Sequence, residues 1–231
     1  MSEPARPVRF PAEPWRLRGD MYAAVWAVPV RELPRRRLPA GVRPLVVGGR
    51  CAVVTFWVDY REGGDLAYRE LLVALPVRHR RRAAVTAVAA WVDDERSMAG
   101  GRALWGIPKR LGTFAFGAPA PAGRRRSRRA AVRTRLLAGG PGAAEGRYQD
   151  LVRLPGRWPV RSLLVQRRPD GTPREVPLRL TGAVSMGRAR LLADPAGPLA
   201  FLGRRRPLLA GAVRDFRFTV GRERTPPDGG E

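Results

Sequence analysis

Residues 105–112, WGIPKRLG, contain the chain's only lysine, Lys109, and its only isoleucine, Ile107. The 44 basic residues therefore include 43 (44 − 1) arginines, and a composition rich in residues with GC-rich codons explains why arginine replaces lysine elsewhere. Arginine keeps its proton in proteins, whereas lysine can lose it. A single retained lysine thus predicts a position where a nitrogen must become neutral, as it does in a nucleophilic amine.

A carboxylate on an apolar face is the second chemical feature. In LAYRELLVALPV, residues 66–77, alternation places Glu70 on the same face as Tyr68, Leu72 and other apolar residues. Two interpretations stay open: Glu70 is a core glutamate paired with an arginine, or it is a general acid or base, or an orienting group, beside Lys109. The pattern does not choose between them.

The neighbours of Lys109 are apolar, and this bears on the charge of its amine. They are Trp105, Ile107, Pro108, Leu111 and Phe114. A lysine in water has a pKa of about 10.4, and burial disfavours the charged form, which lowers the pKa by roughly 3–5 units. We expect a strand here to hold the amine in an apolar pocket with a lowered pKa, while Arg110 points to the opposite face.

Strands must position these two groups, because Val-, Trp-, Tyr- and Phe-rich segments alternate with turns that contain Gly and Pro. The only helix predicted starts at Asp94, which caps it, and ends at Gly106 and Pro108. This arrangement favours an antiparallel sheet or barrel. The predicted strands cover residues 22–28, 51–60, 66–77, 83–93, 130–137, 160–167, 176–186 and 212–220.

The length of 231 residues suits one domain, which we place at residues 1–220, with a disordered tail at 221–231. Residues 117–129, GAPAPAGRRRSRR, are predicted to form a mobile loop. The N-terminal residues have no apolar signal-peptide core, and the longest nearly apolar run is too short to span a bilayer. A single cysteine, Cys51, excludes an intramolecular disulfide and is predicted to be buried. We therefore expect a soluble, cytoplasmic protein with no membrane partner.

Several enzyme classes lack their residues in this chain. His79, the only histidine, lies among arginines and is predicted to be exposed, which argues against a Ser/His/Asp triad or a histidine metal site. No serine has a G-x-S-x-G context, and the glycine-rich residues 138–146 have neither dinucleotide-binding spacing nor a Walker lysine. We expect no cofactor and no metal.

The formal net charge of +24 is a feature that nucleic-acid-binding proteins share. The arginine runs, however, are scattered, and most of them lie between apolar segments. We interpret them as solvated loops and expect no nucleic-acid partner. The runs are Arg35–Arg37, Arg78–Arg82, Arg124–Arg129 and Arg204–Arg206, the second interrupted by His79 and the third by Ser127.

The segment GGRALWGIPKRLGTFAF, residues 100–116, follows WVDDERSMA and, further upstream, AYRELLVALPV. Together these segments resemble the acetoacetate decarboxylase family. The resemblance covers residues 15–116, and the C-terminal half is similar only in its β-rich character. In that family the first lysine after the proline forms a Schiff base with the substrate, and it corresponds to Lys109. A glutamate on an earlier strand corresponds to Glu70.

The resemblance implies a β-rich α+β fold in which antiparallel strands close into a barrel or cone with few short helices. It also implies a homo-oligomeric lyase that decarboxylates a 3-oxo acid, a small-molecule keto acid, through a lysine Schiff base. Lys109 is then the nucleophile, and Glu70 transfers protons. The expected substrate-binding residues are Trp91, Trp105 and Ile107 as an apolar wall, Arg102 as a support of the turn or an anion ligand, and Arg110, which keeps the charge of the family's second lysine.

Two other family positions differ here: an arginine of the first strand falls near Ala27, and a further glutamate falls on Thr55. These differences preserve imine chemistry but alter the handling of a substrate carboxylate. A Schiff-base aldolase or dehydratase of the same superfamily is therefore an alternative. So are a non-catalytic protein that binds a small keto compound, and a nucleic-acid-binding module carried by the arginine runs.

Overall fold

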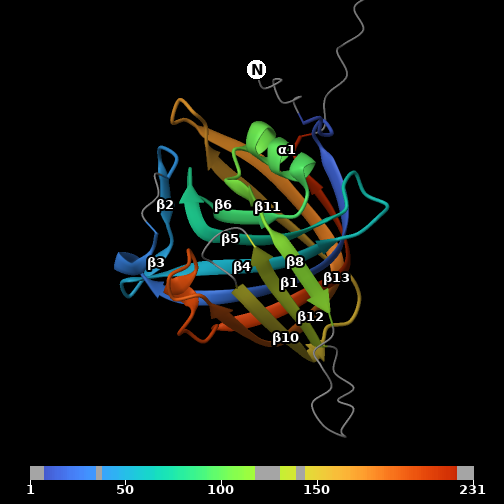
Figure 1. Cartoon of the computed structure of the whole chain (residues 1–231). Coiled ribbons are helices and arrows are strands. Elements are labelled where there is room, and N and C mark those ends of the chain that lie inside the picture. Colours follow the sequence, from blue (N-terminus) through green and yellow to red (C-terminus); the bar gives the residue numbers. More distant parts are fainter. Residues whose placement is uncertain (1–7, 35–37, 118–130, 139–143, 223–231) are drawn as a thin grey trace, which may run out of the picture.

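Alternating apolar residues build most of the described chain into strands (Figure 1). The computed structural model describes residues 8–34, 38–117, 131–138 and 144–222. Within them lie one α-helix, α1 (Glu95–Trp105), and two 3-10 helices, η1 (Val30–Glu32) and η2 (Ala200–Leu202). The thirteen strands of the single sheet are β1 (Trp15–Pro29), β2 (Val42–Pro44), β3 (Val46–Val47), β4 (Arg50–Tyr60), β5 (Tyr68–His79), β6 (Arg82–Val92), β7 (Lys109–Leu111), β8 (Thr113–Gly117), β9 (Ala131–Ala138), β10 (Ala144–Arg153), β11 (Trp158–Arg167), β12 (Pro173–Ala193) and β13 (Leu209–Val220).

The predicted strands all overlap observed strands, and the predicted helix is α1. The sequence pattern does not predict β10, because its inward positions include Gly146 and Asp150, which interrupt the apolar alternation. The predicted loop at 117–129 and tail at 221–231 lie outside the described residues, apart from Gly117 and residues 221–222.

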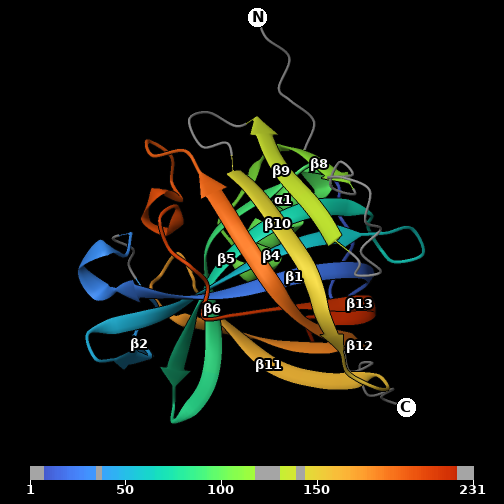
Figure 2. The same ribbon diagram turned by 90° about the horizontal axis from the view of Figure 1, so that it is seen from below.

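Seven strands close into a ring in the order β11, β6, β5, β4, β1, β13 and β12. The ring closes because β11 pairs with both β6 and β12. Strand β12 is long enough to leave the ring at its C-terminal half, where it pairs with β10, and β9 and β8 follow (Figure 2). The pairs are antiparallel except β6 with β7 and β6 with β11. The expected β-rich α+β fold with few short helices is confirmed.

Two apolar cores lie on opposite faces of β4, because successive side chains of a strand point to opposite sides. Val53 and Trp57 belong to one core, here named the distal core, which β8, β9 and β10 cover. Val58 and Tyr60 belong to the other, here named the lysine-side core, which also contains Trp105 of α1. The two faces of the shared strands therefore carry two separate environments.

Helix α1 closes one end of the lysine-side core (Figure 1). The Asp94 side chain accepts a hydrogen bond from the Ser97 backbone N–H at 2.7 Å, and Gly106 ends the helix with a left-handed φ of 70°. The ring of Trp105 meets that of Trp15 edge-on at 4.6 Å between centroids. Capping and packing thus fix this short helix against β1.

None of the helices in the described segments has the length and apolar character that a membrane span requires.

Candidate active site

The lysine and the glutamate singled out in the sequence form a buried ion pair. Lys109 Nζ lies 3.2 Å from Glu70 Oε1, and their side chains are 2% and 5% exposed. Strand β6 brings them together, since Lys109 on β7 pairs with Ala90 while Glu70 on β5 pairs with Val92 two residues away. Residues two apart share a face of a strand, so both side chains point into the lysine-side core.

Two hydroxyl groups complete the surroundings of the amine. Nζ donates hydrogen bonds to Ser97 Oγ at 2.9 Å and to Tyr68 Oη at 3.3 Å. An ammonium group has three N–H donors, so Glu70, Ser97 and Tyr68 can engage all of them. The sequence analysis assigns no role to Ser97 or Tyr68. The alternation in β5 already places Tyr68 on the face of Glu70, whereas no local pattern connects Ser97 with Lys109, because their contact depends on how α1 docks.

The charge of the amine differs from the expectation. Burial is the largest single influence and lowers the pKa of Lys109, but the Glu70 carboxylate and the Tyr68 phenol together outweigh it. The pKa of Lys109 is therefore raised above its ordinary value, and the prediction of a lowered pKa is wrong for the resting protein. Lys109 rests as an ammonium paired with a carboxylate, so it becomes nucleophilic only after it gives up a proton.

Gly101 of α1 makes room for the lysine side chain. A Cβ added at this position would lie 2.7 Å from Lys109 Cδ and 2.8 Å from Cε, closer than carbon atoms approach. The neighbouring Gly100 has a different role, because its added Cβ would meet the Trp15 ring at 2.5 Å. Both glycines weaken the helix by propensity, and packing explains why they are there.

Gly101→Ala is expected to displace the amine of Lys109 and slow imine formation by roughly 10²-fold, since small misplacements of a reacting group can cost that much. The measurement is the rate of reductive trapping with a keto acid and borohydride. Gly100→Ala is the matched control, because it crowds Trp15 instead and should lose stability while it retains the trapping rate of the folded fraction. A wild-type trapping rate in Gly101→Ala would show that the glycine is not needed for the position of the amine.

Four of the five other predicted site residues divide into two groups. Trp105 and Ile107 are buried in the lysine-side core. Arg102 and Arg110 are exposed instead and line an open surface depression of about 320 Å³ beside Lys109. Arg102 Nε donates to the Lys109 carbonyl at 2.7 Å, so it supports the turn.

Trp91, the fifth, belongs to neither group. It pairs with Leu71 on β5, and both belong to the distal core, whereas its neighbours Ala90 and Val92 face the lysine-side core. The structure therefore separates Trp91 from Lys109 by the thickness of the sheet. The alternation within β6 is clear from the sequence, but which of its faces meets Lys109 is not.

The two departures from the family pattern also lie away from the amine. In the row of Glu70, the β4 residue is Val58 and the β1 residue is Met21, so Ala27 is six residues further along β1. At about 3.3 Å per residue this is roughly 20 Å. Thr55 is on the distal face of β4, where its Oγ1 accepts a hydrogen bond from Trp26 Nε1 at 3.0 Å.

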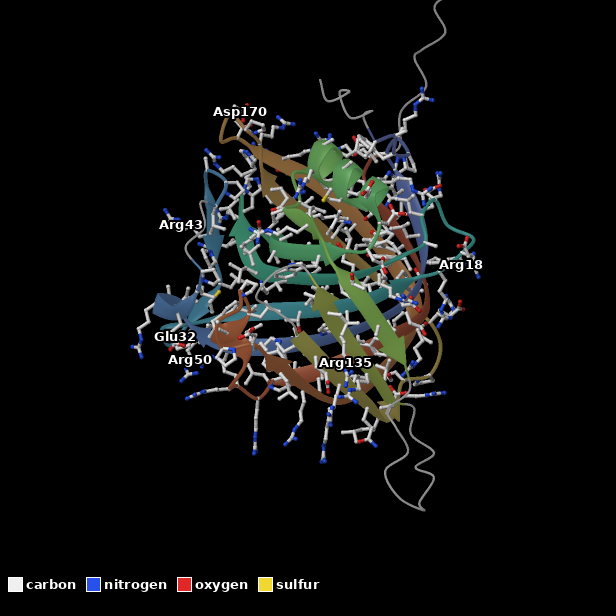
Figure 3. All side chains as sticks on the ribbon, in the orientation of Figure 1. Arg18, Glu32, Arg43, Arg50, Arg135 and Asp170 are labelled. Atoms are coloured by element: carbon white, nitrogen blue, oxygen red, sulfur yellow. The ribbon has the colours of Figure 1, made fainter. Side chains whose placement is uncertain are left out.

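The only histidine is buried, which corrects the expectation that it is exposed. His79 is 3% exposed, and its Nε2 lies 2.9 Å from Glu175 Oε1. Cys51 is buried, as predicted. Many arginines lie at the periphery of the molecule, as Figure 3 shows for Arg18, Arg43 and Arg50. Within the described ranges, no three His, Cys, Asp or Glu side chains are grouped so that they could hold a metal ion.

Buried tyrosines and Lys109 make stability depend on alkaline pH. Burial raises the pKa of Tyr68, and that of Tyr148 in the distal core, from 10.0 to about 12. The pKa of Lys109 is also raised, because Glu70 and Tyr68 outweigh the effect of burial. A pKa raised by folding contributes stability that is complete below the unfolded pKa and is lost as pH rises through the folded one. The free energy of unfolding should therefore fall from about pH 10 to about pH 12.

This loss is measurable by urea unfolding at several pH values, with Tyr148→Phe as the comparison. The variant has one titrating phenol fewer, so its free energy of unfolding should fall less steeply over the same range. Parallel curves for the two proteins would mean that Tyr148 titrates equally in the folded and unfolded chains.

The chain is similar to known proteins both in sequence and in fold. The family model described as acetoacetate decarboxylase matches residues 4–180. A search of curated protein sequences gave no match. The fold is similar to that of an acetoacetate decarboxylase from Legionella pneumophila subsp. pneumophila str. Philadelphia 1, with a TM-score of 0.66, 17% identity, and coverage of 99% of this chain and 93% of that one.

Two further solved structures share the fold. The enduracididine biosynthesis enzyme MppR, complexed with the condensation product of pyruvate and imidazole 4-carboxaldehyde, has a TM-score of 0.62 and 20% identity, with coverage of 95% of this chain and 91% of that one. An acetoacetate decarboxylase-like enzyme from Sphingomonas wittichii RW1 has a TM-score of 0.57 and 19% identity, with coverage of 90% and 91%. At these identities the similarity shows a common fold.

Proposed function

Because this chain belongs to the acetoacetate decarboxylase family, we propose that it is a lyase that decarboxylates a 3-oxo acid through a Schiff base on Lys109. The observation that carries this proposal is the pair of Lys109 Nζ and Glu70 Oε1, 3.2 Å apart and almost fully buried. A buried amine beside a proton acceptor has what imine formation requires: a nucleophile and a base in contact with it.

Imine formation begins with proton transfer inside the pair. Glu70 takes one proton from the Lys109 ammonium, and the two charges disappear together, which suits an apolar core where isolated charges are costly. The neutral nitrogen then attacks the ketone carbon of the substrate, and the carbonyl oxygen leaves as water. The product is an iminium cation beside the Glu70 carboxylate, so the charges of the resting pair are restored.

The iminium is the electron sink for loss of carbon dioxide. The bond between the carboxylate carbon and the adjacent carbon breaks, its electron pair forms the enamine double bond, and the iminium charge is neutralised. The enamine carbon then takes a proton that originates from water, and hydrolysis releases the ketone and regenerates the amine. Arg102 and Arg110, which line the depression beside Lys109, are the cations available to attract the substrate carboxylate.

An aldolase or dehydratase reaction through the same imine is the second candidate. None of the described side chains that contact Nζ is a cation that could hold a substrate carboxylate at the reacting carbon. MppR, which shares the fold, is complexed with the condensation product of pyruvate and imidazole 4-carboxaldehyde. An iminium supports that chemistry as well, because it stabilises the same enamine.

A panel of 2-oxo and 3-oxo acids, each tested alone and with an aldehyde, separates these functions. The proposal predicts release of carbon dioxide from at least one 3-oxo acid together with a borohydride adduct on Lys109. Condensation or cleavage products without carbon dioxide would favour the aldolase, and binding without an adduct would favour the non-catalytic protein. Tight, salt-dependent binding to DNA or RNA that Lys109→Arg leaves unchanged would favour the nucleic-acid module.

A further inference from the structure

The Tyr68 phenol lies against the reacting nitrogen, and the proposed decarboxylation assigns it no chemical role. Its Oη is 3.3 Å from Lys109 Nζ, and Nζ is also 4.9 Å from the centre of the Tyr68 ring. Tyr68 is 6% exposed and packs at 4.5 Å between ring centroids on Tyr60, which is also buried. The phenol is thus held in place beside the amine.

Imine formation moves two protons from nitrogen to oxygen. The ammonium starts with three protons, the iminium keeps one, and the departing water carries the other two. Glu70 can hold the first of them, because it takes that proton before the attack. The second leaves the nitrogen only after the nitrogen–carbon bond has formed, when the new alkoxide lies next to the nitrogen and Glu70 is already protonated.

We propose that Tyr68 is a catalytic residue that carries this second proton from the nitrogen to the oxygen of the carbinolamine. The proposal rests on the Schiff-base function above. The Tyr68 hydroxyl gives its proton to the alkoxide and takes one from the adjacent N–H, so it ends unchanged. The hydroxyl of the carbinolamine then leaves with the proton stored on Glu70, the nitrogen lone pair forms the C=N bond, and water departs.

Both hydroxyls are within hydrogen-bond distance of the amine, and acidity favours Tyr68 over Ser97. Ser97 Oγ is closer, at 2.9 Å, but an aliphatic hydroxyl is a weaker acid than a phenol. The backbone of Ser97 is also tied to the Asp94 cap, so Ser97 serves to orient the amine. Burial raises the pKa of Tyr68 to about 12, so at neutral pH the phenol holds the proton that it must donate.

Tyr68→Phe tests this assignment, because it removes the hydroxyl and keeps the ring that packs on Tyr60. The probe is acetone, trapped with cyanoborohydride at increasing acetone concentrations, and the adduct is followed by mass. We expect the limiting rate of iminium formation to fall by about 10²-fold, the lower end of the range for general acid–base catalysis, while the half-saturating acetone concentration stays unchanged. A positional defect alone would change that concentration as well.

Tyr148→Phe is the matched control, since Tyr148 is a buried phenol in the distal core with a similarly raised pKa. It should trap acetone at the wild-type rate. A wild-type limiting rate in Tyr68→Phe, while the parent protein forms the adduct, overturns the role of Tyr68 and leaves the Schiff base intact. Absence of an adduct in the parent protein overturns the proposed function itself, so the two failures are distinguishable.

Discussion

Replacing Lys109 with arginine should abolish the borohydride adduct at position 109 and reduce turnover of the keto acid by roughly 10⁴-fold or more, as loss of a covalent nucleophile does elsewhere. Arginine keeps a positive charge beside Glu70, so the ion pair of the resting protein persists in kind. The guanidinium does not give up its proton, so no nucleophile forms. Carbon dioxide release and whole-protein mass after reduction measure the two effects.

A fold check must accompany this variant, because the larger guanidinium enters a closed site next to Gly101. Circular dichroism and urea unfolding give the folded fraction to which turnover is referred. Lys109→Met combined with Glu70→Gln is a second inactive variant that removes both charges at once. Turnover close to wild type in a folded form of either variant would exclude Lys109 as the nucleophile.

Replacing Glu70 with glutamine should cost both stability and turnover. The ammonium of Lys109 then lacks its buried counter-ion, and breaking such a pair costs roughly 3–5 kcal/mol at neutral pH. The variant also loses the carboxylate that raises the pKa of Lys109, so burial prevails and the pKa falls. The stability deficit should therefore shrink as pH rises through the new, lower pKa, where the amine becomes neutral.

Turnover of Glu70→Gln should fall by roughly 10³- to 10⁴-fold, because the group that stores and returns a proton is lost. Glu145→Gln is the control: Glu145 pairs with Arg133, Arg135 and Arg147 on β9 and β10, away from the amine, and its loss should leave turnover unchanged. A stability deficit without a loss of turnover would make Glu70 a structural partner only, which is the first interpretation of its position on β5.

The pairing of Lys109 with Glu70 illustrates what the sequence can predict. A lone lysine with apolar neighbours and a carboxylate in an alternating strand are local patterns. Each predicts that its own side chain is buried. Their contact depends on β6 lying between β5 and β7, which only the sheet topology provides. The resemblance to the family implies the same contact, because it assigns both residues to one active site.

The features that the sequence did not predict depend on contacts that are distant in the chain. The sequence predicts a lowered pKa for Lys109 because burial can be inferred locally, whereas the charge that raises this pKa comes from Glu70 on another strand. Ser97 reaches the amine only because α1 docks over β7. The prediction for Trp91 is wrong because the alternation in β6 leaves open which of its faces meets the lysine. The sequence does not predict strand β10 because Gly146 interrupts its apolar alternation. Glycine is needed there because a Cβ would meet the side chains of Thr134 and Trp57.

Peptide mass mapping after borohydride reduction with a 3-oxo acid tests the central claim most directly. Because Lys109 is the only lysine in the chain, a reduced imine can form there or on the N-terminal amine, and the two sites fall on different peptides. The Schiff-base account predicts one adduct per chain, on the peptide that contains Lys109. An unmodified Lys109 under conditions where the substrate is consumed would contradict it.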